Sequence, residues 1–344
     1  MELSPSAESC VSEVFCNYTV NDTYDYDEEL EYTCAKPNTE SISAAFFLVI
    51  FILGMTGNGI LLGVLVRYED LKVVTNLFVL NLALSDLVFT LTLPFWATYY
   101  LSHWVFGDFA CKLVTAAYAA GLYSSVILLT AMTLDRFTKV VLRKWLSEPR
   151  KRRWCAVAAC AAAWLISVAV SVREAVHSRT LVVEVDGEPI YTCEAFAVDP
   201  GSTDVRVRYY LKISFLFFLP FVIVSFCYSA ILRTICLAVS RKKQRTVLVA
   251  LCVVVTFFIC WAPYNIMVVV QIIYVPQDCD AVHIFNLVLD VCKLLAYSHC
   301  CMNPMLYMLS KNFRKHLLSM FRCENTRQTR SERDNVPSRM LTAA

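Results

Sequence analysis

The chain contains seven apolar stretches that are each long enough to cross a lipid bilayer as a helix. A helix needs about 20 predominantly apolar residues to span the hydrocarbon core of a membrane. The chain is 17% charged, whereas soluble domains carry about 25% charged residues. The sequence therefore predicts an all-α membrane protein, a bundle of seven transmembrane helices. We place the spans at Ile42–Val66, Val73–Leu101, Asp108–Leu142, Trp154–Val172, Val207–Val239, Thr246–Val275 and Ala281–Leu309.

The third span has a length that matches a membrane. From Cys111 to Arg136 a helix rises roughly 37 Å at 1.5 Å per residue. A bilayer with both of its interfaces is about 40 Å thick. Cys111 is therefore expected at one membrane face, and the pair Asp135-Arg136 at the other.

The basic residues of the connecting segments predict the orientation. Residues 102–107 contain no lysine or arginine, whereas residues 143–153, 233–245 and 311–322 are rich in both. Cytosolic loops carry an excess of these residues. We therefore expect a multi-pass plasma-membrane protein with its N-terminus outside the cell and its C-terminus inside.

This orientation divides the chain into four parts. Residues 1–41 form an extracellular acidic tail, 42–309 the membrane domain, 310–322 a short cytosolic amphipathic helix, and 323–344 a cytosolic tail. Cys323, directly after the amphipathic helix, is a candidate for palmitoylation.

The extracellular tail holds ten acidic residues and one lysine. Asn17 and Asn21 begin glycosylation signals. Tyr24 and Tyr26 lie among carboxylates, a setting typical of sulfated tyrosines. Such a tail either solvates the surface as a disordered segment or attracts a basic partner. The tyrosines favour attraction, because they provide specific contacts that solvation does not need.

Six of the 16 cysteines lie on the predicted extracellular side. An even number in an oxidising compartment indicates disulfides. Six cysteines can pair in fifteen ways, and composition does not choose among them. The six are Cys10, Cys16, Cys34, Cys111, Cys193 and Cys279.

Two spans carry charged residues at depths where a charge is costly. Asp86 lies in the middle of span two. It is either a structural hydrogen-bonding group or part of a cation or proton site. Asp290 and Lys293 lie in the outer third of span seven, at a spacing that lets them pair. Their depth also suits a ligand pocket.

Two prolines are expected to bend their helices, because proline lacks a backbone donor. Pro94 lies in span two, and Pro263 lies in span six near Trp261. A kink beside a bulky aromatic side chain is either a conformational switch or a simple bend.

The extracellular loop after span four has the pattern of a β-hairpin. Leu181–Val185 and Ile190–Cys193 flank Asp186-Gly187, a dipeptide typical of the primed turns that join two strands. We expect this hairpin to lie over the extracellular mouth of the bundle.

Taken together, these residues resemble a known family over roughly residues 42–322. The chain is similar to class A (rhodopsin-like) G-protein-coupled receptors through Gly57-Asn58, Leu82–Asp86, Asp135–Phe137, Trp164, Pro220, Tyr228, Cys260–Pro263 and Asn303–Tyr307. Within this class it resembles the chemokine receptors through Thr92–Trp96, Trp104–Gly107, Ser298–Pro304 and Asn312–Lys315. Lys293 stands where most chemokine receptors have glutamate, as in the XC-type (lymphotactin) receptors. Tyr68–Leu71, Gly107–Leu113 and Pro263–Asn265 resemble that type as well.

The resemblance implies roles for particular residues. It implies the disulfides Cys111–Cys193 and Cys34–Cys279. It implies ligand binding by Tyr24 and Tyr26 in the tail and by a pocket of Trp96, Tyr118, Tyr264, Asp290 and Lys293. It implies an activation switch in which Arg136 leaves Asp135 to meet Tyr228 and Tyr307, with Trp261, Pro263, Asn303 and Pro304 taking part. It implies an allosteric sodium site of Asp86, Ser125, His299 and Asn303, and no other cofactor.

The function implied by the resemblance is signalling, not enzyme activity. The chain would bind a small basic chemokine, of lymphotactin-like XC type, and activate a heterotrimeric G protein of the inhibitory class. Receptor kinases, arrestin and membrane lipid are further expected partners, and nucleic acid is not. Phe137 replaces a tyrosine of the family motif and Lys139 a small apolar residue. These departures leave an alternative, an atypical scavenging chemokine receptor that signals through arrestin only.

A different class of function is a transporter or a membrane enzyme. Transporters often contain repeated halves with discontinuous helices, and the sequence shows no internal repeat. A zinc protease would need a motif such as H-E-x-x-H, which the five scattered histidines do not form.

Overall fold

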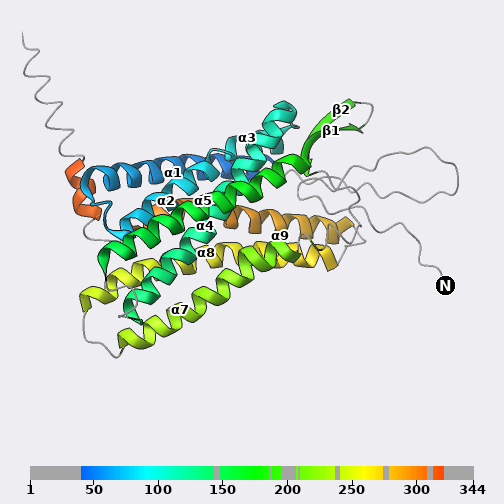
Figure 1. Cartoon of the computed structure of the whole chain (residues 1–344). Helices are drawn as coiled ribbons and strands as arrows, with labels where there is room; N and C mark the ends of the chain where they lie inside the picture. The colour runs from blue at the N-terminus through cyan, green and yellow to red at the C-terminus, as the bar shows by residue number, and fades with distance from the viewer. Residues whose placement is uncertain are drawn as a thin grey trace, which may run out of the picture.

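A computed structural model describes residues 40–142, 148–185, 188–195, 207, 210–236, 241–273, 279–307 and 313–320. Within them, seven helical segments are long and apolar enough to cross a membrane, which confirms the predicted fold class. Figure 1 shows the helices side by side in one elongated bundle. The predictions for Asn17, Asn21, Tyr24, Tyr26, Cys323 and the pair Cys34–Cys279 lie outside the described residues.

The elements follow the predicted order, with ends that differ by a few residues. The helices are α1 (Glu40–Tyr68), α2 (Val74–Thr90), α3 (Leu93–Leu101), α4 (Gly107–Val140), α5 (Pro149–His177), α7 (Leu219–Cys236), α8 (Arg241–Ile273), α9 (Cys279–Tyr297) and α10 (His299–Tyr307). Between α5 and α7 lie the strands β1 (Ser178–Val185) and β2 (Glu188–Ala195) and a π-helical turn, η1 (Ser214–Phe218). A further short helix covers residues 313–320.

The second span is interrupted between α2 and α3, as expected from Pro94. Two threonine hydroxyls add hydrogen bonds next to the break: that of Thr92 donates to the Phe89 carbonyl at 2.7 Å, and that of Thr90 to the Asp86 carbonyl at 2.5 Å. Threonine can bond in this way to the preceding turn of its own helix. The break leaves α3 to carry Trp96 and Tyr100 at one end of the bundle.

The seventh span is also interrupted, at Ser298, where no break was predicted. Side chains replace backbone donors at three consecutive carbonyls. The Ser298 hydroxyl donates to Leu295, the His299 imidazole contacts the Ala296 carbonyl at 2.8 Å, and the Cys300 thiol donates to Tyr297. Since each carbonyl keeps a partner, the helix stops and restarts without leaving these groups unpaired.

The π-helical turn η1 was also not predicted. It ends directly before Leu219-Pro220. Pro220 has no backbone N–H to offer to the carbonyl four residues earlier. One π-helical turn accommodates the missing hydrogen bond, and the helix continues as α7.

The helix α4 packs against α2, α5, α7 and α8. It approaches α2 closely at Gly121, where a Cβ atom would lie 2.7 Å from the backbone nitrogen of Phe89. A side chain at this position would separate the two helices. The glycine therefore sets the spacing that brings Asp86 of α2 next to Ser125 of α4.

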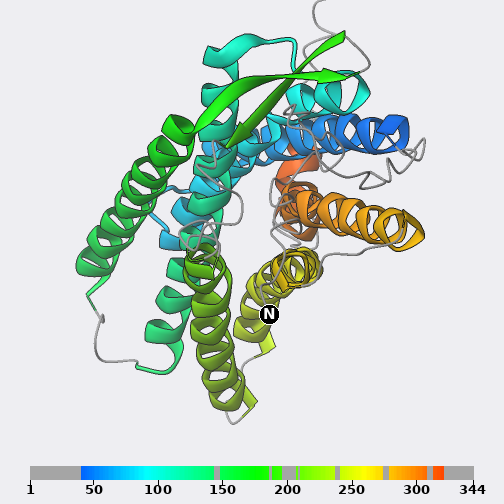
Figure 2. The same cartoon turned by 90° about the vertical axis from the view of Figure 1, so that its right-hand side faces the viewer.

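The predicted hairpin is present, with Leu181 paired to Thr192 and Val183 to Ile190. Its turn, Asp186-Gly187, lies outside the described residues. The disulfide Cys111–Cys193 is confirmed, and it joins β2 to the first turns of α4. Figure 2 looks onto this end of the bundle and shows the strands crossing over helix ends. We call it the hairpin end.

The short helix 313–320 lies at the opposite end of the bundle (Figure 1). Its Phe313 is buried against Leu61 and Val64 of α1. His316 stacks on Tyr68, with ring centroids 5.5 Å apart, and its Nε2 lies 3.7 Å from a carboxylate oxygen of Glu69. The amphipathic helix expected over residues 310–322 thus contains a helix docked on α1.

Candidate functional site

A cavity opens among α4, α8 and the start of the fifth span, where residues 212–213 and η1 line it. It encloses about 600 Å³, its open mouth included. Its floor is apolar and aromatic, with Leu122, Phe257 and Trp261. The Phe257 and Trp261 rings are stacked, with centroids 6.0 Å apart.

The predicted ligand-binding residues divide between this cavity and a neighbouring group. Tyr118 and Tyr264 line the cavity. Trp96, Asp290 and Lys293 are not among its lining residues. Tyr118 lies between the two compartments, since its ring centroid is 6.3 Å from that of Trp96.

The neighbouring group is organised by Tyr100 of α3, which the sequence reasoning missed. The Tyr100 hydroxyl donates to Oδ1 of Asp290 at 3.1 Å and accepts from Nζ of Lys293 at 3.3 Å. The Lys293 ammonium also lies 5.5 Å from the Tyr100 ring centroid. Lys293 is only 6% exposed, and buried cations require such partners. The tyrosine thus links the two residues that the i, i+3 spacing had placed on one face.

A second polar group was also missed, on the other side of the cavity. Lys212 lines the cavity, and its Nζ lies 3.8 Å from Oε1 of Glu174. The Tyr123 hydroxyl donates to the same oxygen at 3.1 Å. The sequence did contain a signal for this group, the lysine inside the apolar span 207–239. An ionisable residue within a transmembrane segment usually marks a functional site.

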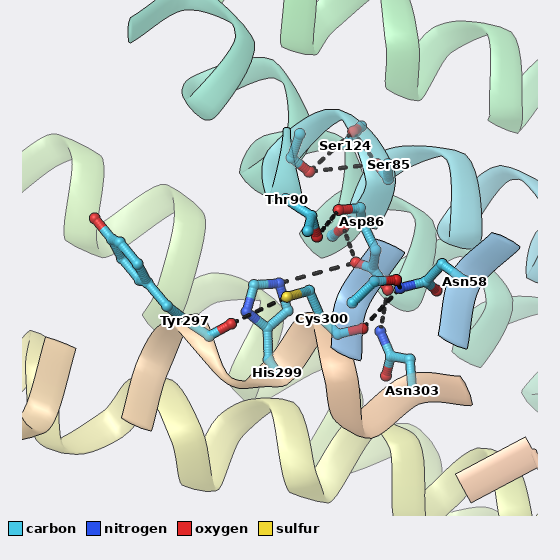
Figure 3. A network of polar contacts seen from close by, with 12 residues as sticks. Asn58, Ser85, Asp86, Thr90, Ser124, Tyr297, His299, Cys300 and Asn303 are labelled. Atoms are coloured by element: carbon cyan, nitrogen blue, oxygen red, sulfur yellow. Dashed lines mark hydrogen bonds and ion pairs between the residues drawn. The ribbon is translucent and has the colours of Figure 1, made fainter. Parts of the chain in front are cut away.

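The four residues of the predicted sodium site meet around Asp86, and Figure 3 labels Asp86, His299 and Asn303. Ser125 donates to Oδ1 of Asp86 at 3.1 Å, and Asn303 donates to Oδ2 at 2.7 Å. Nε2 of His299 lies 3.9 Å from Oδ1. The Asp86 side chain is fully buried, so its charge depends on these partners.

The His299 imidazole presents a lone pair to the carboxylate. Its Nδ1 lies 2.8 Å from the Ala296 carbonyl oxygen, which can only accept, so Nδ1 donates. In the neutral ring Nε2 is then an acceptor, and it has no hydrogen-bond partner among the described residues. Two acceptors, Nε2 and Oδ1 of Asp86, therefore face each other in a buried site. A cation or a proton between them would satisfy both.

This polar group reaches α1 through a second amide. Asn58 donates to the Cys300 carbonyl at 2.8 Å and to the Gly54 carbonyl at 3.0 Å (Figure 3). Ser85 and Ser124 form a further hydrogen bond between α2 and α4. The helices α1, α2, α4 and α10 are thus joined by polar contacts at one level of the bundle.

The acid-base pair at the end of α4 is arranged differently from the prediction. Arg152 of α5 donates to both carboxylate oxygens of Asp135, at 2.7 and 2.6 Å. Arg136 instead donates to the Thr75 hydroxyl at 2.9 Å. Among the described side chains, Asp135 is therefore held by Arg152 and not by Arg136. A bidentate fork from another helix fits a carboxylate better than the adjacent residue can.

The remaining predicted switch residues lie either near Arg136 or further along α8 and α10. Arg136 is 5% exposed and lies near the hydroxyls of Tyr228 and Tyr307. Trp261 lies at the cavity floor, and Pro263 lies within the run of α8. Asn303 and Pro304 are buried in α10.

The chain matches the family model "7 transmembrane receptor (rhodopsin family)" over residues 57–307. It is 35% identical to Chemokine XC receptor 1 of Homo sapiens over 289 residues, which cover 81% of each chain. It is 34% identical to Chemokine XC receptor 1 of Mus musculus over 315 residues, 89% of this chain and 93% of the relative. It is 30% identical to C-C chemokine receptor type 1 of Homo sapiens over 319 residues, 88% of each chain.

Proposed function

Because this chain belongs to the rhodopsin family of seven-transmembrane receptors and, within it, to the chemokine receptors, we propose that it binds a small basic chemokine and activates a heterotrimeric G protein. Family membership makes it a multi-pass receptor of the plasma membrane and not an enzyme. The observation that carries the proposal is the continuity of the cavity with the buried polar group. The cavity floor Trp261 contacts His299, which faces Asp86.

The ligand of this proposal is a chemokine of the XC (lymphotactin) type. The identity to the two XC receptors and the basic residue Lys293 support this choice. The acidic tail, with Tyr24 and Tyr26, collects the basic folded body of the ligand through charge attraction. The ligand's N-terminal segment then enters between the Tyr100 group and the cavity, passing Tyr118.

Signalling follows from a shift between two arrangements of the helices. The ligand stabilises the active one only to the extent that it binds that arrangement more tightly. Contact at Trp261 moves α8 about Pro263, and Arg136 then exchanges Thr75 for Tyr228 and Tyr307. The cleft opened at that end admits a G protein of the inhibitory class. Kinases then modify the tail 323–344 for arrestin.

A sodium ion is proposed as an allosteric ligand at Asp86. The carboxylate of Asp86 and the hydroxyl of Ser125 are the oxygen ligands that hard cations prefer, and the unpartnered Nε2 of His299 faces the same space. The ion would supply a positive charge that holds these residues and Asn303 together in the resting arrangement.

One experiment tests the G-protein step. Cells expressing the full chain are exposed to a panel of chemokines that includes the XC type, and cyclic AMP is measured. We expect a fall in cyclic AMP that is abolished by pertussis toxin and by Arg136→Ala. Recruitment of arrestin with no fall in cyclic AMP would overturn the G-protein proposal.

That outcome would favour the second candidate, a scavenging receptor that signals through arrestin only. Phe137 and Lys139 support it, because both stand at the end of α4 beside Arg136. The glycans at Asn17 and Asn21, sulfation of Tyr24 and Tyr26, and palmitoylation of Cys323 also remain proposals. Mass spectrometry of the protein from cells tests all three modifications.

A further inference from the structure

The cavity has one charged side chain among its described lining residues, Lys212. The rest of its wall is apolar or aromatic, with polar groups from Tyr118, Tyr123, Tyr264 and Asn265. One N–H of the Asn265 amide donates to the Trp261 carbonyl at 2.8 Å. An apolar body with one anionic group would therefore match this wall in both polarity and charge.

Lys212 has an internal counter-ion, Glu174, and the Tyr123 hydroxyl lies within hydrogen-bonding reach of both residues. The Nζ of Lys212 lies 3.8 Å from Oε1 of Glu174, which is longer than a charge-assisted hydrogen bond of about 2.7–2.9 Å. Glu174 is not among the described lining residues of the cavity. The Lys212 side chain is 35% exposed and that of Glu174 is 31% exposed. Lys212 can thus be reached from the cavity.

Glu174 does not depend on Lys212 alone. The Tyr123 hydroxyl donates to the same Oε1 at 3.1 Å. When Lys212 turns toward an anion in the cavity, Glu174 keeps this hydrogen bond. The carboxylate is then not left unpaired, which would otherwise cost free energy.

We propose that this cavity binds a carboxylate carried on an apolar or aromatic body, with Lys212 as its counter-ion. The Tyr123 hydroxyl then remains the hydrogen-bond partner of Glu174. The aromatic floor of Phe257 and Trp261 receives the body. A phosphate is less suited to this cavity, because Lys212 is a single point charge and no arginine fork is present among the described lining residues.

The inference deepens the proposed function and rests on it only in placing the cavity on the ligand's route. The carboxylate has two sources. It is an acidic side chain near the N-terminus of a protein ligand, or it is a free apolar carboxylic acid. Both bring the same chemistry to Lys212, and different probes separate them.

The test uses the full chain in lipid nanodiscs and a fluorinated probe. Binding of 6-(4-fluorophenyl)hexanoate is measured by ¹⁹F NMR and compared with that of its primary amide, which has the same shape and no charge. We expect the acid to bind at least tenfold more tightly than the amide. Equal affinity of acid and amide would overturn the proposal.

Three variants identify the counter-ion. Lys212→Gln should abolish the preference for the acid, and Lys212→Arg should retain it. Glu174→Gln should tighten acid binding several-fold, because it removes the competing carboxylate. A merely structural ion pair predicts the opposite for Glu174→Gln, a loss of binding similar to that of Lys212→Gln. That result would overturn the proposal, and it remains readable even where Lys212→Gln does not fold.

A peptide arm distinguishes the two sources. Acetyl-Phe-Glu-Phe-amide is compared with acetyl-Phe-Gln-Phe-amide in the same assay. A preference for the glutamate peptide that depends on Lys212 supports a protein ligand, and a preference confined to the hexanoate supports a free acid. No chemokine enters the assay, so failure of this inference leaves the proposed function untouched, and failure of the proposed function leaves this result readable.

Discussion

The indole of Trp261 and the imidazole of His299 are in edge contact, with ring centroids 5.5 Å apart and planes at 62°. Trp261 forms part of the cavity floor, and His299 faces the Asp86 carboxylate. Phe257 also contacts the imidazole, at 5.4 Å. A ligand that displaces the floor of the cavity therefore also displaces the residue that faces the Asp86 carboxylate.

Sodium should stabilise the protein through Asp86. A ligand that binds the folded state raises its melting temperature. We expect the melting temperature to rise when choline chloride is replaced by sodium chloride at the same concentration. Asp86→Asn should remove the rise, since it removes the anionic ligand. An equal rise in both proteins would contradict the proposed site.

Loss of the Tyr100 hydroxyl should weaken ligand binding. Tyr100→Phe retains the ring beneath the Lys293 ammonium and removes the hydroxyl that joins Lys293 to Asp290. A buried polar group that loses its partner costs about 1–3 kcal/mol, so chemokine potency should fall about tenfold. Cyclic AMP dose–response curves at matched surface expression measure the change. Lys293→Glu should act in the same direction, and unchanged potency in both variants would show that this group is not an anchor.

Removal of the Arg152 guanidinium should change the partner of the Asp135 carboxylate. In Arg152→Ala the carboxylate loses both hydrogen bonds and becomes available to Arg136, the adjacent residue. Arg136 would then be restrained, so the fall in cyclic AMP should need several-fold more chemokine. Arg152→Lys should recover only part of the response, because lysine lacks the bidentate fork.

A matched control for Arg152 lies next to it. Lys151 pairs with Glu148, but its side chain is 77% exposed, and such surface pairs contribute about 0–1 kcal/mol. Lys151→Ala should leave potency unchanged. Equal effects of the two alanine variants would point to lost basic charge on this face and not to the Asp135 contact.

Gly121→Ala should destabilise the bundle. The added Cβ would lie 2.7 Å from the Phe89 nitrogen, and overpacking of this kind costs about 1–3 kcal/mol. Gly59→Ala is the control, because nothing lies within 4 Å of its Cβ. It should be neutral or stabilising, since alanine is favoured over glycine in helices by about 1 kcal/mol. Melting temperatures of the two variants should move apart, and a fall of equal size in both would contradict the close approach of α2 and α4.

The sequence could predict the fold because length, polarity and charge bias are local properties. Each span shows its own apolar run, and the hairpin shows its strands on either side of Asp186-Gly187. The break at Pro94 followed from the missing donor. The break at Ser298 did not, because it depends on serine, histidine and cysteine side chains that each replace a backbone donor. Those side chains form helices equally well elsewhere.

The residues of the candidate site could be predicted where they match positions of a family motif. Asp86, Ser125, His299 and Asn303 converge as expected. The partners from other helices were not predictable, since Tyr100, Arg152 and Glu174 are joined to the site by tertiary contacts that no spacing along the chain encodes. Only Lys212 carried a signal, as a charge inside an apolar span.

The interruption at Ser298 makes α10 a short helical segment separate from α9. The segment from His299 to Tyr307 is about 12 Å long at 1.5 Å per residue. Asn303, which bonds Asp86, lies near its middle, and Tyr307, which lies near Arg136, is at its tip. A tilt of about 10° at the joint would carry the tip roughly 2 Å over that length. Because both residues lie on this one helix, a tilt that carries Asn303 away from Asp86 also repositions Tyr307.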